Sequence, residues 1–174
     1  MKPTAMAEST RVELNAAAAL TVDVQVACSD TGIPHDDDIT AWVELAVAAS
    51  GRLPGQDAEL AVRVVDADEI RALNESYRRQ DQPTNVLSFP AGAVPGMPDD
   101  AVRMLGDVVV CASVVRAEAE EQGKALADHW GHMLVHGTLH LLGYDHEADS
   151  DAAEMERLEA QILARRGLAD PYTS

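Results

Sequence analysis

The chain has 174 residues, of which 47% are hydrophobic and 25% are charged, and its formal net charge is −17 at pH 7. This length suits a single globular domain, and because no apolar run approaches the roughly 20 residues that cross a bilayer and no signal segment is convincing, we expect a cytoplasmic protein rather than a membrane protein. The strong negative charge argues against binding of nucleic acid over the whole surface, since such binding depends on Lys and Arg that neutralise the phosphates.

Residues 1–20 are rich in Ala, Thr and Glu without strong periodicity, so we predict a flexible N-terminal extension. One domain then follows over 21–174. Residues 21–27 alternate apolar and polar side chains, which is the pattern of a half-buried strand. Residues 36–50 begin with acidic side chains and continue with apolar ones at helical spacing, which predicts a helix.

Strand and helix alternate again in the next part of the chain. A strand is predicted over 58–66, and a helix over 66–79 whose acidic first turn is favourable at the positive end of the helix dipole. Residues 84–90 form a short β-branched and aromatic run between Pro83 and Pro90. Because proline cannot donate a hydrogen bond to a neighbouring strand, we predict an edge strand here.

The last part of the chain predicts one more strand and three more helices. Residues 104–113 indicate a strand that enters a helix through Ser113 as its N-cap. Residues 124–143 predict a long apolar helix that ends at Gly143, and 149–167 predict a final amphipathic helix. The total is about four strands and four or five helices, which indicates a mixed α/β or α+β domain.

Three histidines lie close together in the segment HGTLHLLGYDH. His136 and His140, four residues apart on a helix, are about 40° apart around the axis and roughly 6 Å apart along it, so both can reach one ion. His146 can join them only if the helix ends in between, and Gly143 stands where a left-handed cap would reverse the chain. Three neutral imidazoles with one open position make a zinc-type site that can hold a water or a substrate oxygen.

His132 also lies four residues before His136, but one tetrahedral ion cannot bind both His132 and His140, which are about 12 Å apart along the axis. We therefore expect His132 to be a hydrogen-bond donor behind the metal ligands or a surface residue. A single histidine is more often structural than metal-binding, and His35 and His129 keep that interpretation. Three histidines at these intervals around a helix-ending glycine favour a metal site.

The same intervals match the metzincin protease signature H-E-x-x-H-x-x-G-x-x-H at each metal-binding position and at the glycine. Gly137 stands where that signature has its catalytic glutamate. Without the carboxylate that takes a proton during peptide hydrolysis, ordinary proteolysis is disfavoured. Phosphodiester cleavage depends less on such a base, because a metal ion can polarise a phosphoryl oxygen and RNA carries its own 2′-hydroxyl.

A cation for the phosphate is available in the segment LNESYRRQDQPTNVLSFP. Arg78 and Arg79 close the predicted helix of this segment, and the planar guanidinium of arginine is suited to binding phosphate. Residues 61–98 carry four arginines against five acidic residues, a net charge of −1, which is compatible with a local cationic face on an acidic body. Arginines at a helix C-terminus are also favoured by the helix dipole alone, and this alternative remains open.

The chain resembles the YbeY family of bacterial endoribonucleases, which take part in ribosomal RNA maturation. The blocks LNESYRRQDQPTNVLSFP, LGDVVV and HGTLHLLGYDH resemble that family's blocks in order and separation, over roughly residues 22–172. The resemblance implies a single α+β domain, with a small mixed sheet packed against the helices and a metal site at the end of a long central helix. It also implies one Zn²⁺ ion bound by His136, His140 and His146.

By the same resemblance, Arg78 matches the arginine of the family's YR pair, which implies contact with RNA or phosphate close to the metal. Arg78 and His136 are therefore the candidate catalytic residues. The resemblance further implies ribosomal RNA, the small ribosomal subunit, ribosomal proteins and a GTPase assembly factor as partners.

Three functions are therefore open. The first is a zinc-dependent endoribonuclease that prefers single-stranded RNA and acts in ribosomal RNA processing, ribosome maturation and ribosome quality control. The second is a non-catalytic ribosome-assembly factor with a structural zinc site, which the net charge of −17 favours because an acidic body can recruit basic ribosomal proteins. The third, a metal-dependent peptidase with a displaced base, is weakened by Gly137.

Overall fold

The computed structural model describes residues 11–15, 18–53, 55–92, 96, 101–145 and 148–172, with side chains from residue 19 onward. Its strands, in chain order, are β1 (Arg11–Asn15), β2 (Ala18–Val26), β3 (Ala58–Val65), β4 (Val86–Pro90) and β5 (Arg103–Cys111). Its helices are α2 (Asp36–Ser50), α3 (Ala67–Arg78), α4 (Ala112–Gln122), α5 (Leu126–Leu141) and α6 (Asp149–Ala164). The predicted order of strands and helices from residue 21 onward is confirmed.

The five strands form one mixed sheet in the order β1-β2-β3-β5-β4. The central strands β2, β3 and β5 are parallel, and β1 and β4 pair antiparallel with their neighbours. β4 lies at an edge of the sheet, where Pro83 and Pro90 place it. The α+β fold with a small mixed sheet is thus confirmed, and the sheet has one strand more than the sequence indicates.

The additional strand comes from the N-terminal part of the chain. β1 and the start of β2 precede residue 21, where the sequence predicts that the domain begins, so the sheet starts earlier than expected. Residues 1–10 lie outside the described part of the chain, and only for them does the predicted flexible extension stay a prediction.

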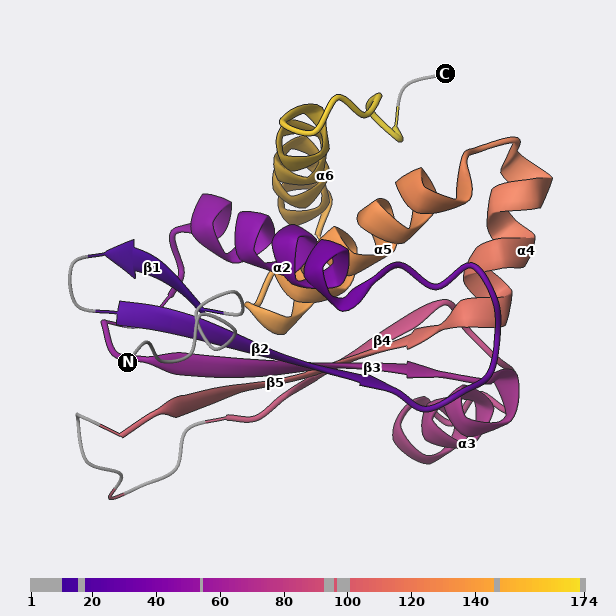
Figure 1. The fold of residues 1–174 in the computed structure, drawn as a ribbon, viewed down its shortest axis with the longest axis horizontal. Coiled ribbons are helices and arrows are strands. Elements are labelled where there is room, and N and C mark those ends of the chain that lie inside the picture. Colours follow the sequence, from indigo (N-terminus) through magenta and orange to yellow (C-terminus); the bar gives the residue numbers. More distant parts are fainter. Residues whose placement is uncertain are drawn as a thin grey trace, which may run out of the picture.

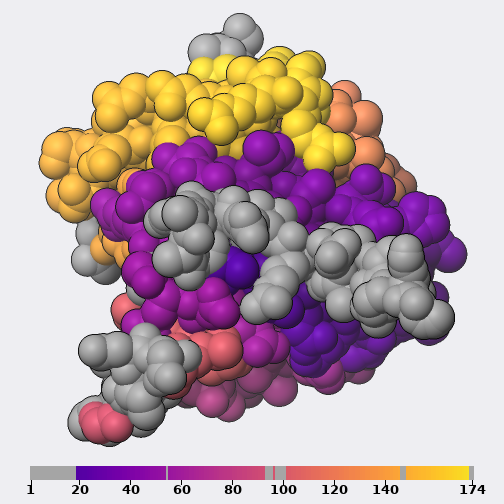
Figure 2. Space-filling model, turned by 60° about the vertical axis from the view of Figure 1, so that its left-hand side comes forward, coloured from indigo at the N-terminus to yellow at the C-terminus, as the bar shows by residue number. Residues whose placement is uncertain are grey.

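The two faces of the sheet are covered by different helices (Figure 1). α2 and α5 pack on one face, and α3 packs on the opposite face. Side chains of β3 alternate accordingly, because Leu60 and Val62 join the large core under α2 and α5, whereas Val65 joins a small core with Ile70 of α3. α6 packs on α2 and α5 from outside and lies along α2 in Figure 2. α5 is therefore the central helix, held between the sheet and other helices.

The start of α3 follows the local sequence, whereas the start of α4 does not. α3 begins after Asp66, whose carboxylate accepts a hydrogen bond from the Glu69 backbone N–H over 2.9 Å. The predicted N-cap at Ser113 is wrong, because β5 continues to Cys111 and α4 begins at Ala112 without a side-chain cap. None of the described helices is long and apolar enough to cross a membrane.

α5 lies unusually close to the sheet at Gly137. A Cβ atom at this position would be 2.7 Å from Val108 Cγ1 and 2.8 Å from Val86 Cγ2. The Ser88 hydroxyl donates a hydrogen bond to the Gly137 carbonyl oxygen over 2.7 Å. The position that carries a glutamate in the protease signature therefore faces β4 and β5 and has no room for a side chain.

The chain reverses direction after α5, as the glycine in this segment predicts. α5 ends at Leu141, and Gly143 has a positive φ of 99°, which favours glycine. The Tyr144 N–H donates to the Leu139 carbonyl oxygen over 3.1 Å and closes the turn.

Replacing Gly137 with alanine is expected to lower the free energy of unfolding by about 1–3 kcal/mol, because the added methyl group must displace Val86 or Val108. The higher helix propensity of alanine offsets at most about 1 kcal/mol of this loss. Chemical denaturation followed by circular dichroism measures the change. Ala127→Ser, at an exposed position of α5, is the control and should change the same free energy by less than about 0.5 kcal/mol. A Gly137→Ala variant as stable as the parent would contradict the close packing of α5 on the sheet.

Candidate metal centre

His136 and His140 lie one turn apart on α5 with their rings in contact. The ring centroids are 4.6 Å apart and the ring planes meet at 79°. His136 Nδ1 lies 2.8 Å from Oε1 of Glu159 in α6, and His140 Nδ1 lies 2.9 Å from the carbonyl oxygen of Tyr144. A carboxylate and a carbonyl accept hydrogen bonds, so Nδ1 carries the proton in each ring and the lone pair of each neutral ring is on Nε2.

This arrangement fits a zinc ion. Histidines that bind a metal through one ring nitrogen usually donate the other N–H to a carboxylate or a backbone carbonyl, which fixes the tautomer and the ring orientation. Zinc in proteins binds neutral imidazole nitrogen. The structure thus brings together two of the three predicted ligands and holds both rings in the form that can bind the ion.

The third predicted ligand, His146, lies outside the described residues. The described residue before it that bears on the site is Tyr144, which is buried with its ring under the Arg52 guanidinium, 3.7 Å from the ring centroid. The Tyr144 hydroxyl also donates to the Ser50 carbonyl oxygen over 3.4 Å. These contacts fix the carbonyl group that accepts the His140 hydrogen bond. The participation of His146 stays a prediction.

A second group of side chains, which includes His136 itself, could hold a metal ion. It consists of His132, His136 and Glu159, and one ligand atom from each lies within 4.8 Å of the others. Glu159 has no exposed surface. Its Oε2 accepts hydrogen bonds from His132 Nε2, over 3.0 Å, and from the Tyr172 hydroxyl. His132 is therefore a hydrogen-bond donor, and its side chain is 13% exposed.

The Glu159 carboxylate is stabilised by these donors without a metal. Burial raises the pKa of Glu159, but hydrogen bonds from His132, His136 and Tyr172 outweigh burial and lower the pKa to about 2. Both Glu159 oxygens already accept hydrogen bonds, Oε1 from His136 and Oε2 from His132 and Tyr172. The geometry therefore fits Glu159 better as the acceptor behind His136 than as a ligand.

Arg78 belongs to α3, on the other face of the sheet from α5. It is the last residue of that helix, and Arg79 follows in the left-handed conformation with a φ of 58°. The neighbouring Tyr77 is 69% exposed, and its ring packs edge-on against Phe89 of β4 with centroids 4.9 Å apart. β4 connects the two regions, because Ser88 bonds to α5 and Phe89, the next residue, contacts α3.

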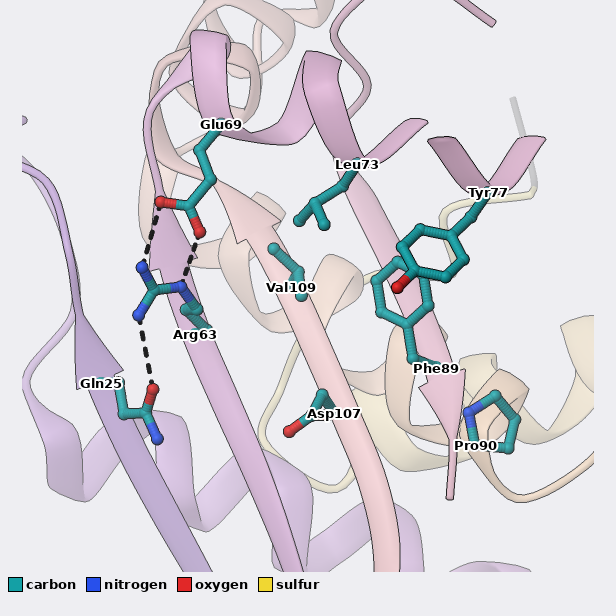
Figure 3. A pocket seen from close by; sticks show the side chains of 9 residues that line it. All are labelled: Gln25, Arg63, Glu69, Leu73, Tyr77, Phe89, Pro90, Asp107 and Val109. Carbon is teal, nitrogen blue, oxygen red and sulfur yellow. Dashed lines mark hydrogen bonds and ion pairs between the residues drawn. The ribbon is translucent and has the colours of Figure 1, made fainter. Parts of the chain in front are cut away.

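A groove of about 580 Å³ opens beside Tyr77 on the face of the sheet that α3 covers (Figure 3). Its walls come from four strands and α3, and the lining residues are Gln25, Arg63, Glu69, Leu73, Tyr77, Phe89, Pro90, Asp107 and Val109. Glu69 holds Arg63 through two hydrogen bonds of 2.7 and 3.1 Å. The groove is separate from the candidate metal centre, because it opens on the face of the sheet that α3 covers, whereas His136 and His140 belong to α5 on the other face.

The sequence predicts no function for two residues of the centre, Glu159 and Tyr172. The sequence does contain a sign that Glu159 is buried, because Glu159 stands between Met155 and Ile162 at the spacing of the apolar face of α6. An acid at a core position of an amphipathic helix indicates a buried partner. Tyr172 carries no comparable signal, since it lies beyond the last helix and reaches Glu159 only through the tertiary fold.

Comparisons with known proteins give one consistent result over most of the chain. A family model described as Endoribonuclease YbeY matches residues 25–167. A protein with that description from Halorhodospira halophila is 57% identical over 139 residues, which cover 80% of this chain and 88% of the relative. A second, from Alkalilimnicola ehrlichii, is 54% identical over 160 residues, which cover 91% of this chain and 95% of the relative.

More distant proteins match over a similar span. An Endoribonuclease YbeY from Colwellia psychrerythraea is 44% identical over 151 residues, which cover 87% of this chain and 96% of the relative. The solution structure of TM1509 from Thermotoga maritima is 23% identical and covers 87% of this chain and 99% of that chain, with a TM-score of 0.49.

The stability that Glu159 gives the metal-free protein is expected to fall in acid. Its pKa of about 2 in the folded protein lies below the ordinary value of 4.5, so the contribution is complete above about pH 4.5 and is lost as the pH falls towards 2. We therefore compare the free energy of unfolding of the parent with that of Glu159→Gln. The difference between them should be about 2 kcal/mol smaller at about pH 3 than at about pH 6. Denaturant titrations at several pH values measure it, and a difference that is independent of pH would contradict the assignment.

Proposed function

We propose a function that starts from one fact: the chain belongs to the YbeY family of endoribonucleases. In this proposal the protein is a zinc-dependent enzyme that prefers single-stranded RNA. It acts in ribosomal RNA processing, ribosome maturation and ribosome quality control. Membership of the family makes the chain a hydrolase of phosphodiester bonds and implies an RNA substrate. The observation that supports the zinc-dependent part is the pair His136 and His140, in which each Nδ1 donates to a fixed acceptor.

In this proposal His136, His140 and His146 would hold one Zn²⁺ ion. When bound, zinc supplies a Lewis acid that polarises a phosphoryl oxygen of the scissile phosphodiester. The chain orients the two described rings, because Glu159 accepts the Nδ1–H of His136 and the Tyr144 carbonyl accepts that of His140. Gly137 places no carboxylate beside the ion, which agrees with phosphodiester rather than peptide cleavage.

Arg78 is proposed to bind an RNA phosphate near this centre. Its exposed guanidinium can form two parallel hydrogen bonds with a phosphate. RNA that crosses the edge strand β4 would pass from Ser88, bonded to α5, to Phe89, which packs on the residue before Arg78. A single strand bends over such an edge more easily than a stiff duplex, which supports the proposed preference.

The proposed partners are ribosomal RNA, the small ribosomal subunit, ribosomal proteins and a GTPase assembly factor. The net charge of −17 favours basic protein partners, because an acidic surface attracts them and speeds their association. The same charge repels phosphates, so contact with RNA must depend on local cations such as Arg78.

Substitution of His140 should separate the two possible ligand sets. His140→Ala is expected to weaken zinc binding on the order of 100-fold or more, because it removes a ligand, and His132→Ala by less than about tenfold, because it removes only a donor to Glu159. Competition with a chromophoric chelator measures both affinities. If His132→Ala abolished zinc binding while His140→Ala preserved it, the ion would belong to His132, His136 and Glu159 instead.

Reversing the charge at Arg78 should weaken RNA cleavage without affecting the metal. Arg78→Glu is expected to lower kcat/KM for single-stranded RNA by about tenfold or more, because a phosphate contact is lost and a negative charge is added. The slope of log affinity for RNA against log salt concentration should decrease by about one. Arg157→Glu, the same charge change at an exposed position of α6, is the matched control. Equal losses in both variants would show that net charge alone matters.

A further inference from the structure

Glu159 joins three separate segments of the chain through hydrogen bonds. Its carboxylate, on α6, accepts from His136 and His132 of α5 over 2.8 and 3.0 Å and from the hydroxyl of Tyr172, which follows α6. The Glu159 side chain is 0% exposed. A buried carboxylate is strongly unfavourable unless donors replace the water that it loses, and these three donors account for its burial.

The two histidines of the proposed zinc site differ in what supports them. His140 donates to the backbone carbonyl of Tyr144, and no side-chain substitution removes that acceptor. His136 donates to a side chain, Glu159, whose own position depends on its other donors. A change at Glu159 or at its partners should therefore act on His136 and leave the support of His140 in place.

Tyr172 is held against Glu159 by the segment that follows α6. Residues 165–172 run from the end of α6 back over α5 (Figure 1). Leu168 packs on the large core, and the Tyr172 N–H donates to Asp170 Oδ1 over 2.8 Å. The Tyr172 ring meets the His132 ring edge-on, with centroids 5.7 Å apart. The hydroxyl is thereby directed at Oε2 of Glu159, the oxygen that His136 does not use.

We propose that Glu159 and Tyr172 are positioning residues for His136, so that the affinity of the centre for zinc depends on the segment that follows α6. This inference rests on the proposed role of His136 as a zinc ligand. Glu159 holds the proton on Nδ1 and orients the ring, and Tyr172 fixes one carboxylate oxygen so that the other stays directed at His136. Loss of either contact loosens a ligand without removing it, and second contacts of this kind tune metal affinity.

The zinc affinity of the full chain tests this dependence, measured by competition with a chromophoric chelator. Glu159→Gln is expected to bind zinc about 10–100-fold more weakly than the parent, and Tyr172→Phe about 3–10-fold more weakly. Tyr172→Phe keeps the ring against His132 and removes only the hydroxyl. Tyr77→Phe is the matched control, because it makes the same change at an exposed tyrosine of α3, and it should leave the affinity unchanged. Circular dichroism confirms that each variant is folded at the temperature of the measurement.

The visible absorption spectrum of the Co²⁺-loaded protein is a second readout, which a purely structural role would not change. A positioning role predicts bands of tetrahedral Co²⁺ in every variant, shifted or broadened in Glu159→Gln. If Glu159→Gln instead changed the coordination or abolished zinc binding, Glu159 would be a ligand and the inference would be overturned. Variants that bind zinc as tightly as the parent would overturn the inference alone. A parent protein that binds no zinc would overturn the proposed function as well.

Discussion

Two hydrogen bonds determine which ring nitrogen of His136 and of His140 can bind a metal. They run from His136 Nδ1 to Glu159 and from His140 Nδ1 to the Tyr144 carbonyl. Both acceptors come from outside α5, one from α6 and one from the turn after Gly143, so the local helix alone does not prepare the rings. This arrangement of the two rings depends on the packing of α5, α6 and this turn, so the proposed zinc site would couple metal binding to the tertiary fold.

The contact of α5 with the sheet decides which way the histidines face. Gly137 lies against Val86 and Val108 without room for a Cβ atom. With residue 137 directed at the sheet, helical geometry places His136 and His140 on the same flank of α5, about 100° and 60° away from that direction. The same contact excludes the glutamate of the protease signature. One packing constraint thus orients the two histidines and leaves no room for the base on which peptide hydrolysis depends.

Features that depend on neighbouring residues could be predicted from the sequence. The close approach of His136 and His140 follows from a spacing of four on a helix, the reversal at Gly143 from the conformational freedom of glycine, and the edge position of β4 from its prolines. The burial of Glu159 is indicated by its place on the apolar face of α6, but its partners and the role of Tyr172 could not be found in this way, because Glu159 and the residues that it contacts are more than ten residues apart in sequence and meet only in the folded chain. The N-cap predicted at Ser113 failed because the strand before it extends into the position of the cap.

The tautomers of His136 and His140 test this account most directly. A long-range ¹H–¹⁵N correlation spectrum of the metal-free protein at about pH 8 shows which nitrogen of each ring carries the proton. Protonation of Nδ1 in both rings is the expected result. A spectrum in which Nε2 carries the proton in either ring would contradict the hydrogen bonds on which the metal centre depends.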